Sequence, residues 1–367
     1  MLEVLQVIGD GSLGGGTTAV LSLSQELSER GVAVTIASQR ASHIIAQARE
    51  RGLRTLELEF GTRRQSGRIA QSLANYLRNS PPAVVHAHGA RAGLPVSMLP
   101  RDIGRSRIYT VHGFHYRQKP AGIRHVAKMV ERFCIRRAMA TVFVSNSDAQ
   151  IARQEGLIAD EGRCHVIRNG CREAEAAIAP GRPGFDIAFL GRLHHQKNPL
   201  ILPEILAALR PACPTLCVIG TGEYETELRR RLGEAGLTDQ VTFCGARPHA
   251  EALDILSSAR VMLLPSRWEG LPISVVEAMH RAIPVVASNI PGTDELIVDG
   301  QTGYLVDIED ARGYADRLRR LLTDERQRRE MGQTALRHAR EHFSLEPQVR
   351  AYLSLYGRVS RREERLH

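Results

Sequence analysis

Short apolar runs rich in valine and isoleucine alternate with longer amphipathic stretches along almost all of the 367 residues. The runs are nearly continuous in apolar residues, which is typical of parallel strands covered by helices on both faces. The expected strands are Val4–Ile8, Val32–Ala37, Val84–Ala87, Ile108–Val111, Thr141–Val144, His165–Ile167, Asp186–Leu190, Leu216–Ile219, Val241–Phe243, Val261–Leu264 and Val285–Ala287. The expected helices include Ala19–Arg30, Arg68–Arg78, Arg124–Ala138, Pro203–Leu209, Glu225–Ala235 and Ala250–Ser257. This order predicts an α/β chain with doubly wound parallel sheets.

This alternation of expected strands and helices is interrupted once, at residues 172–184. These residues read REAEAAIAPGRPG and contain no pattern of a buried strand. Directly afterwards FDIAFLGRL repeats the strand followed by a glycine turn that opens the chain. We therefore expect two Rossmann-like domains of similar size, joined by a linker. The predicted boundaries are 1–172 for the first domain, 173–184 for the linker and 185–342 for the second domain. Residues 343–367 are expected to be helical and to cross back towards the first domain.

The chain carries 49 Lys and Arg against 40 Asp and Glu, a formal net charge of +9. This surplus favours an anionic partner such as a nucleotide, a nucleic acid or an acidic lipid headgroup, without choosing among them. No run approaches the ~18 apolar residues of a membrane-spanning helix, and the start lacks the basic residues of a signal peptide. The six cysteines form no C-x-x-C pair, so reduced thiols and a cytoplasmic protein are expected.

The first expected strand runs into a glycine-rich turn, GDGSLGGG, at residues 9–16. Such a turn lets backbone N–H groups and a helix N-terminus approach an anion or a sugar closely. Gly9, Gly11 and Gly14 also fit the dinucleotide-binding pattern G-x-G-x-x-G, which leaves an NAD-dependent dehydrogenase as an alternative. The acidic residue that would hold a ribose is missing, because residues 38–40 read Ser-Gln-Arg. A tight turn that binds no ligand is the simpler interpretation of the same pattern.

His112 directly follows the expected strand Ile108–Val111 and precedes Gly113, which leaves space beside it. It therefore belongs to the carboxyl edge of the sheet, where open α/β sheets bind ligands. His86 and His88 follow the preceding strand and reach the same edge. A ligand contact and a purely structural role both remain open for His112. No carboxylate or cysteine is spaced to complete a metal site with these histidines, so we expect none.

Residues 117–137 are rich in cations and contain a single acid, Glu131. Four of the cations recur at intervals of four and would form one stripe along a helix: Arg124, Lys128, Arg132 and Arg136. An apolar stripe lies beside it, formed by Ile123, Val126, Val130 and Phe133. Like charges at this spacing repel, and an anionic membrane surface would relieve the repulsion. The alternative is a solvated basic face whose apolar side packs into the core.

In the second half, the strand Asp186–Leu190 ends in the sequence GRLHHQKNP. Gly191 permits close approach to the backbone, and Arg192 and Lys197 place two cations at the mouth of the loop. Arginine binds phosphate oxygens in a bidentate manner, and lysine supplies a mobile point charge. The pair suits a leaving diphosphate, whose charge grows as the bond to it breaks.

The sharpest motif is PSRWEGLPISVVEAM at residues 265–279, which follows a strand and leads into a helix. Glu269 and Glu277 flank a segment whose backbone amides lie at the start of that helix. Such amides can hold a phosphate or sugar hydroxyls, and carboxylates accept hydrogen bonds from sugar and ribose hydroxyls. Ser274 and Glu277 also have the spacing of a capping box, so Glu277 could cap its own helix. Glu269 and the neighbouring Trp268 have no such explanation.

With these residues assembled, the sequence resembles the retaining GT-B glycosyltransferases of family 4, also called group 1. The resemblance covers essentially the whole chain and is strongest from Gly191 to Val306. Glu269 and Glu277 match the family's E-x7-E signature. The other matching positions are Gly191, Arg192, Lys197 and Asn198 for the Gly-Arg…Lys-Asn element, and Pro284–Ser288, Glu295, Gly300 and Gly303 for the continuation.

The resemblance implies a GT-B fold of two Rossmann-like domains, with the active site in the cleft between them. It implies that Arg192 and Lys197 bind the donor diphosphate, Glu277 the ribose and Glu269 the transferred sugar. The remaining donor-binding residues would be Gly191, Gly270, Leu271, Pro272 and Ile273. It also implies an acceptor-side loop at Gly14, Gly15 and Gly16, and a catalytic role for His112. Many family members carry Asp where this chain has Gly113.

By the same resemblance, a sugar moves from a nucleoside-diphosphate donor, most commonly a UDP-sugar, to a hydroxyl of a saccharide or lipid-linked acceptor. The anomeric configuration would be retained, with the departing phosphate oxygen accepting the proton. The chain has no D-x-D motif, so neither a metal nor another cofactor is expected. Cell-surface polysaccharide or lipopolysaccharide synthesis at the inner face of the membrane fits the basic stripe.

Three alternatives remain at this point. A GT-B sugar-nucleotide epimerase would convert the donor without an acceptor, and a dehydrogenase would bind a nicotinamide cofactor. A basic nucleic-acid-binding module is disfavoured, because the cation clusters lack an aromatic stacking platform and aromatic residues make up only 5% of the chain.

Overall fold

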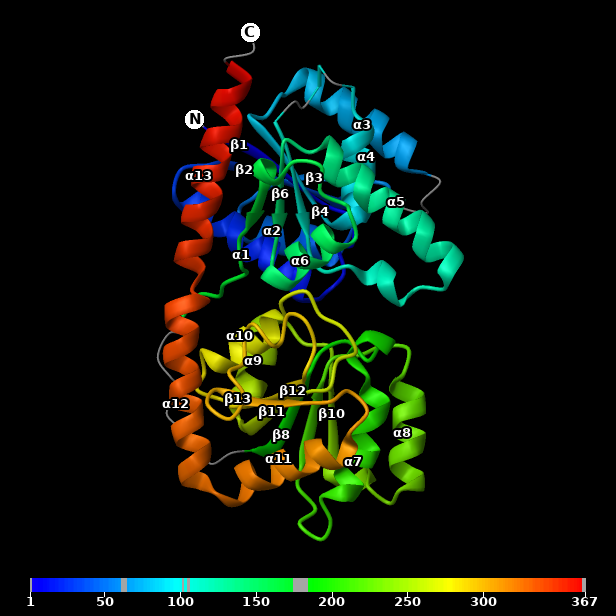
Figure 1. The fold of residues 1–367 in the computed structure, drawn as a ribbon, viewed down its shortest axis with the longest axis vertical. Helices are drawn as coiled ribbons and strands as arrows, with labels where there is room; N and C mark the ends of the chain where they lie inside the picture. Colours follow the sequence, from blue (N-terminus) through cyan, green and yellow to red (C-terminus); the bar gives the residue numbers. More distant parts are fainter. Residues whose placement is uncertain (1, 61–64, 101, 104–105, 174–183, 365–367) are drawn as a thin grey trace. The chain divides into compact units, whose positions relative to one another are not determined.

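The protein is described from a computed structural model that covers residues 2–60, 65–100, 102–103, 106–173 and 184–364. The chain forms two compact units, one of Met1–Gly170 with Leu345–His367 and the other of Cys171–Ser344. Each unit contains one parallel sheet flanked by helices (Figure 1). Most of the predicted linker, residues 173–184, lies outside the described residues.

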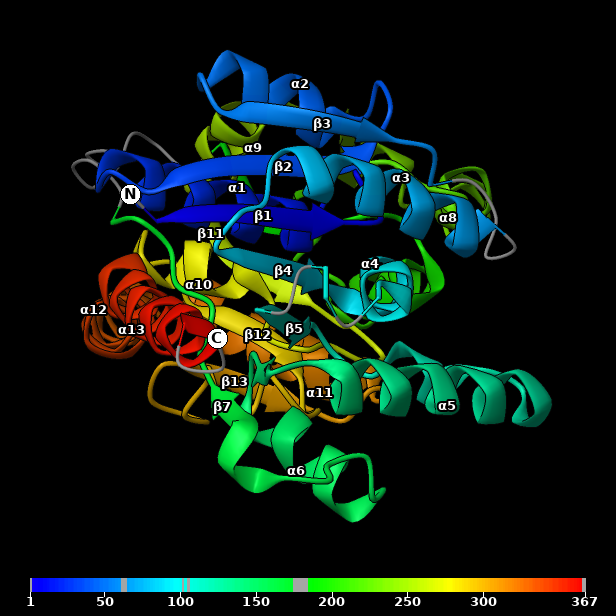
Figure 2. The same ribbon diagram turned by 90° about the horizontal axis from the view of Figure 1, so that it is seen from above.

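The first unit is built on a seven-stranded parallel sheet with the order β3-β2-β1-β4-β5-β6-β7. Its strands are β1 (Glu3–Ile8), β2 (Ala33–Gln39), β3 (Arg54–Leu58), β4 (Val84–His88), β5 (Arg107–Val111), β6 (Ala140–Phe143) and β7 (Cys164–Val166). Its helices are α1 (Gly15–Glu29), α2 (His43–Glu50), α3 (Ser66–Asn79), α4 (Gly89–Met98), α5 (Ala121–Arg137), α6 (Asn146–Gln154) and α13 (Leu345–Glu364). The helices lie on both faces of the sheet (Figure 2).

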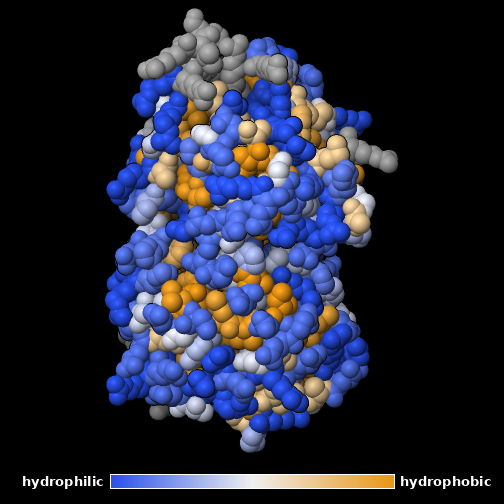
Figure 3. Space-filling view, in the orientation of Figure 1, coloured by the Kyte–Doolittle hydropathy of each residue, from blue (hydrophilic) through white to orange (hydrophobic). Residues whose placement is uncertain are grey.

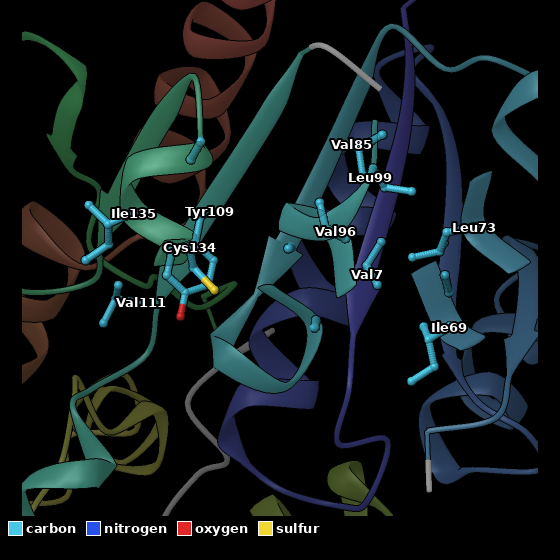
Figure 4. Close-up of a cluster of buried hydrophobic side chains, with 14 of the residues drawn as sticks. Val7, Ile69, Leu73, Val85, Val96, Leu99, Tyr109, Val111, Cys134 and Ile135 are labelled. Atoms are coloured by element: carbon cyan, nitrogen blue, oxygen red, sulfur yellow. The ribbon is translucent and has the colours of Figure 1, made fainter. Parts of the chain in front are cut away.

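Residues of β1 alternate between two apolar clusters, one on each face of this sheet. Leu5 and Val7 belong to the cluster under α3, α4 and α5, part of which is drawn in Figure 4. Val4 and Ile8 belong to the cluster on the opposite face, which includes side chains of α1, α2 and α13. The strand period of two thus supplies apolar side chains to both faces, as a doubly wound sheet requires.

The second unit is built on a six-stranded parallel sheet with the order β10-β9-β8-β11-β12-β13. Its strands are β8 (Phe185–Leu190), β9 (Leu216–Ile219), β10 (Val241–Gly245), β11 (Ala259–Leu264), β12 (Val285–Ser288) and β13 (Gly303–Val306). Its helices are α7 (Leu202–Ala208), α8 (Glu225–Glu234), α9 (His249–Ser257), α10 (Ile273–Met279), α11 (Ala311–Thr323) and α12 (Glu325–His342). Polar side chains cover most of the face seen in Figure 3, with apolar side chains gathered in patches on each unit.

The doubly wound parallel architecture is confirmed, and two strands were missed. Both β3 and β13 are edge strands of their sheets. In β3, polar residues interrupt the apolar run and only Leu58 is fully buried, so the strand lacks the continuous pattern of a central one. The strand β13 was missed because it has only four residues and begins at a glycine, Gly303.

The last helix, α13, belongs to the first unit. It contacts α1, and its residues Tyr352 and Tyr356 are fully buried in the cluster on that face of the sheet. Figure 1 shows it running alongside α1. Among the described residues, no helix combines the length and the apolar composition that crossing a bilayer demands.

Candidate active site

The strand order of the second unit reverses between the neighbouring strands β8 and β11. The loops that leave the carboxyl ends of such a pair diverge, and open α/β sheets bind ligands in the crevice between them. Here these loops are residues 191–198 after β8 and 265–272 after β11. They contain most of the residues predicted to bind the donor.

Lys197 and Glu269 meet across these two loops. The Nζ atom of Lys197 lies 2.6 Å from Oε1 of Glu269, and the two side chains are only 17% and 6% exposed. Gln196 strengthens the contact, because its Nε2 donates to the carbonyl of Trp268 at 3.0 Å. The N–H of Arg267 also donates to the carbonyl of Gln196 at 2.7 Å. A cation and a carboxylate are therefore held together at the switch point.

Gly191, which has no side chain, leaves room for the side chain of Lys197 beside it. A Cβ atom at Gly191 would lie 3.3 Å from Cε of Lys197, closer than side chains normally pack. Arg192 is exposed at the mouth of the same loop. Asn198 ends the turn in a left-handed conformation, with φ of 51°, and is buried. The sequence prediction that these residues form one loop is confirmed.

Two glycines that support this loop were missed. Gly220 and Gly222 follow β9, and a Cβ atom at either position would overlap a carbonyl oxygen of the loop after β8. At Gly220 the overlap is with Gly191, and at Gly222 it is with Leu193. The signal was present as Gly-Thr-Gly directly after an apolar strand. Backbone packs against backbone here, so only glycine fits.

The loop that carries Glu269 is supported in the same way by Gly292. This residue has a φ of 94°, and a Cβ atom on it would overlap the carbonyl oxygen of Gly270. Gly270, Leu271, Pro272 and Ile273 are all buried. The segment after Glu269 is therefore fixed by close packing.

Glu277 does not cap its own helix, so the capping-box alternative is wrong. Helix α10 begins at Ile273 with Pro272 before it, and no side chain caps its start. Ser274 lies inside the first turn, too late to cap the helix. The carboxylate of Glu277 instead accepts a hydrogen bond from Nε2 of His249 at 2.6 Å. His249 was missed, because it comes from the start of α9 and nothing in its local sequence relates it to Glu277.

In the first unit the strand order reverses between β1 and β4, and the glycine-rich turn leaves β1 at that point. Gly15 and Gly16 are exposed, and a Cβ atom at Gly16 would meet nothing within 4 Å. The turn keeps its shape through Thr17, whose hydroxyl donates to the carbonyl of Gly14 at 2.6 Å. At Gly11, in contrast, a Cβ atom would lie 2.5 Å from Cβ of Ser42, so packing alone explains that glycine.

His112 follows β5 at the same carboxyl edge, and its Nε2 lies 3.0 Å from Nδ1 of His88. Burial, and secondly the neighbouring His115, lower the pKa of His112 to about 4. The next residue, Gly113, has a φ of 95°, which explains why glycine suits a position where Asp is common. Within the described parts of the chain, no group of three or more His, Cys, Asp or Glu side chains is placed to hold a metal ion.

The cations predicted to face a membrane lie on α5. Arg124, Arg132 and Arg136 are exposed. Lys128 differs from them, because its Nζ lies 3.0 Å from Oε2 of Glu155. It is therefore partly neutralised within the protein. The only acid of the segment, Glu131, is buried and accepts a hydrogen bond from the hydroxyl of Tyr109 at 2.6 Å.

The alternative that the apolar side of α5 packs into the core holds only for Val130, the one member of the predicted stripe that lies against the core cluster. Ile123, Val126, Met129 and Phe133 are between 40% and 60% exposed. They account for most of the large exposed apolar side chains among the described residues. The buried face of α5 is made instead by Ala127, Glu131, Cys134 and Ile135.

Comparisons with known proteins agree with this geometry. The family described as "Glycosyl transferases group 1" matches residues 175–338, and the "Glycosyl transferase 4-like domain" matches residues 14–170. A D-inositol 3-phosphate glycosyltransferase of Corynebacterium diphtheriae is 28% identical, with 96% of this chain and 92% of that protein covered.

An Escherichia coli enzyme named UDP-Gal:alpha-D-GlcNAc-diphosphoundecaprenol alpha-1,3-galactosyltransferase is also 28% identical, over 69% of this chain and 70% of that one. The crystal structure of Anabaena Alr3699/HepE in complex with UDP-glucose superimposes with a TM-score of 0.81 at 18% identity, covering 99% and 100% of the two chains. Neither the epimerase nor the dehydrogenase alternative is favoured by these findings. The two family matches together span both units, and the chain belongs to the group 1 glycosyltransferases with the GT-B fold.

Proposed function

We propose that this glycosyltransferase transfers a sugar from a UDP-sugar to a hydroxyl of a saccharide or lipid-linked acceptor, with retention of configuration. The pathway would be the synthesis of cell-surface polysaccharide or lipopolysaccharide. The observation that carries the donor assignment is the Lys197–Glu269 pair at the switch point of the second unit. A UDP-sugar and a lipid-linked acceptor are both named for the Escherichia coli relative, which supports the same classes here.

The donor would bind along the loops after β8 and β11. Arg192 and Lys197 provide positive charge for the diphosphate, and Glu269, already bonded to Lys197, accepts hydrogen bonds from the sugar hydroxyls. Gly191 and the segment Gly270–Ile273 let the backbone approach the donor. Glu277 would accept a hydrogen bond from the ribose while it keeps its bond to His249. That the acceptor binds in a cleft between the two domains stays a prediction.

Charge stabilisation would supply most of the catalysis. As the bond between the sugar and the diphosphate breaks, negative charge grows on the leaving oxygen, and Arg192 and Lys197 neutralise it. The acceptor hydroxyl attacks from the same face and gives its proton to that oxygen. No protein nucleophile is required, and we propose that the reaction needs no metal.

The test is a binding screen followed by a transfer assay. Thermal shift with UDP, UDP-glucose, UDP-galactose, a GDP-sugar and NAD should show stabilisation by the UDP compounds, with or without EDTA. Lys197→Ala should lose most of that shift, whereas the exposed surface variant Arg326→Ala should keep it. Binding of NAD alone would contradict the proposal. Conversion of the donor sugar without any acceptor would indicate the epimerase, and the anomeric configuration of the product, read by NMR, tests retention.

We also propose that α5 contacts an anionic membrane surface. The helix presents four exposed apolar side chains flanked by three exposed arginines, the composition of a helix that lies in a membrane interface. Its 17 residues span about 25 Å, and its first turns project beyond the sheet of the first unit (Figures 1 and 2). Each arginine near an anionic surface contributes about 1 kcal/mol to binding. Such contact would bring the enzyme to a lipid-linked acceptor.

Flotation with vesicles of phosphatidylcholine and phosphatidylglycerol tests the membrane contact. The double variant Met129→Ser/Phe133→Ser should reduce recovery with the vesicles at low and high salt, because it removes exposed apolar area that the membrane would bury. Charge reversal of Arg124 and Arg132 should reduce recovery mainly at low salt. Val298→Ser is the matched control, because Val298 is also 40% exposed but lies in the second unit. Recovery of all the variants equal to that of the wild type would contradict the proposed membrane contact of α5.

A further inference from the structure

A continuous line of buried polar side chains connects His112 to the last helix of the chain. Nδ1 of His88 lies 3.0 Å from Nε2 of His112, and Nε2 of His88 lies 2.7 Å from Oε1 of Gln6. Nε2 of Gln6 then donates to the hydroxyl of Tyr356 at 3.1 Å. Gln6, at the centre of β1, is fully buried, and its side chain lies on the face of the sheet that α13 covers.

The line continues beyond Tyr356. Its hydroxyl lies 2.8 Å from Nδ1 of His86, and Nε2 of His86 lies 2.7 Å from the hydroxyl of Thr110. His86 and Thr110 are both fully buried, on the adjacent strands β4 and β5. Burial lowers the pKa of His86 to about 3, and it lowers that of His88 well below its usual value. All three imidazoles are therefore neutral at pH 7.

Because the imidazoles are neutral, the donor and the acceptor of each hydrogen bond in the line can be assigned. A neutral histidine has one donor and one acceptor nitrogen, and an amide oxygen can only accept. Because Oε1 of Gln6 accepts, Nε2 of His88 must donate and Nδ1 of His88 must accept. Nε2 of His112 therefore carries the hydrogen, which leaves a lone pair on Nδ1 of His112.

The same orientation of the Gln6 amide also satisfies the hydrogen bonds from Gln6 through Tyr356 and His86 to Thr110. The amide N–H of Gln6 donates to Tyr356, so the hydroxyl hydrogen of Tyr356 is directed to Nδ1 of His86. Nε2 of His86 then donates to Thr110. Turning the Gln6 amide over would reverse every bond and move the His112 hydrogen to Nδ1. The orientation of the Gln6 amide, whose Nε2 donates to Tyr356, is thus coupled through His88 to the tautomer of His112.

We propose that Gln6, His88 and Tyr356 are positioning residues that hold His112 with its hydrogen on Nε2, so that Nδ1 accepts a hydrogen bond from a substrate hydroxyl. This inference rests on the proposed glycosyl transfer, in which the transferred sugar and the acceptor both carry hydroxyls. Among the described residues, Nδ1 of His112 has no hydrogen-bond partner. The last helix of the chain would then act on the chemistry of His112 as well as on stability.

Long-range proton–nitrogen NMR of the full chain, labelled with ¹⁵N-histidine, tests the tautomer without any need for activity. The His112 signals are assigned by their loss in His112→Gln. We expect the tautomer with hydrogen on Nε2 in the wild type, and a mixture of both tautomers in Tyr356→Phe and in Gln6→Met. A wild-type His112 with its hydrogen on Nδ1 would overturn the proposal.

Tyr352→Phe is the matched control. Tyr352 lies one turn earlier on α13, is equally buried and loses the same hydroxyl, but its oxygen lies only at the far end of the line, 3.4 Å from Thr110. Tyr356→Phe should lower kcat/KM roughly tenfold, within the ~10²-fold that misplaced groups can cause, while Tyr352→Phe stays near the wild type.

Equal losses of activity in the two tyrosine variants, with equal melting temperatures, would show a structural role only and overturn the proposal. If the wild type transfers no sugar from any donor, the glycosyl-transfer proposal fails. The tautomer measurement still decides whether the line of hydrogen bonds sets the state of His112.

Discussion

The two units share a topology and place their polar residues at the same point of the sheet, yet the character of those residues is opposite. The first unit gathers neutral imidazoles, an amide and hydroxyls in a line that is buried except at His112. The second unit holds a lysine against one glutamate and a histidine against another, with side chains between 6% and 35% exposed. Complete burial favours neutral groups, and partial exposure with a partner lets charges persist. The first arrangement suits hydroxyl recognition, and the second suits an anionic donor.

The largest expected effect is a difference in acid stability between the units. In the folded state the pKa of His86 lies near 3, below its ordinary 6.5, so the unfolded chain binds the proton first. The stability that this histidine contributes is present above pH 6.5 and is lost as pH falls towards 3, by roughly 5 kcal/mol. Burial also lowers the pKa of His88 and His112. Glu131 acts in the opposite direction, because burial raises its pKa to about 7 and stability falls as pH rises from 4.5 to 7.

The three histidines together should outweigh Glu131, so the first unit should unfold before the second on acidification. The single tryptophan, Trp268, reports only on the second unit, while circular dichroism reports on both. Helical signal should therefore decrease at a higher pH than that at which the Trp268 emission shifts. Coincident transitions would show that the contrast between the two units has no consequence for stability.

The second prediction removes the charge that distinguishes the second unit. Lys197→Ala should reduce kcat/KM by about 10² to 10³, as expected for loss of one preorganised group that stabilises growing charge. Lys197→Arg should recover part of the activity, since it restores charge with a different shape. Steady-state transfer rates provide the measurement. Turnover of Lys197→Ala close to that of the wild type would mean that the ion pair is structural.

A third prediction concerns how the second unit holds its loop. Gly292→Ala forces a side chain into positive φ and into the carbonyl of Gly270, so we expect a loss of about 1–3 kcal/mol of unfolding free energy, with reduced activity. Gly236→Ala also has positive φ but meets nothing closer than 3.7 Å, so it should cost only about 1 kcal/mol. Urea unfolding followed by Trp268 fluorescence compares the two variants, and equal losses would argue against the close contact.

The smallest expected effect contrasts two serines near helix starts. Ser145 in the first unit is buried and caps α6, accepting from the N–H of Asp148 at 3.0 Å. Ser274 in the second unit caps nothing. Ser145→Ala should therefore cost about 1 kcal/mol, whereas Ser274→Ala should cost less than about 0.5 kcal/mol. Thermal unfolding of both variants checks this, and a large effect of Ser274→Ala would restore the capping interpretation.

Much of the architecture could be read from local composition. Central strands such as β9 and β12 are almost continuously apolar because helices cover both faces of the sheet, and that pattern needs no tertiary information. Glu269, Lys197 and His112 could be singled out because each follows such a strand, at the edge where ligands bind. The edge strand β3 was missed because half of its environment is solvent, which permits polar residues.

Contacts between residues that are far apart in the sequence could not be predicted from local composition. The bond between Glu277 and His249, the support of Gly292 for Gly270 and the line from His112 to Tyr356 each join separate elements. The sequence spacing of Ser274 and Glu277 even suggested a wrong partner. Local periodicity determined where strands, helices and ligand-binding loops lie, because it records which faces are buried. Only folding in three dimensions decided which polar groups meet, because hydrogen-bond partners and close backbone contacts depend on packing between elements far apart in the chain.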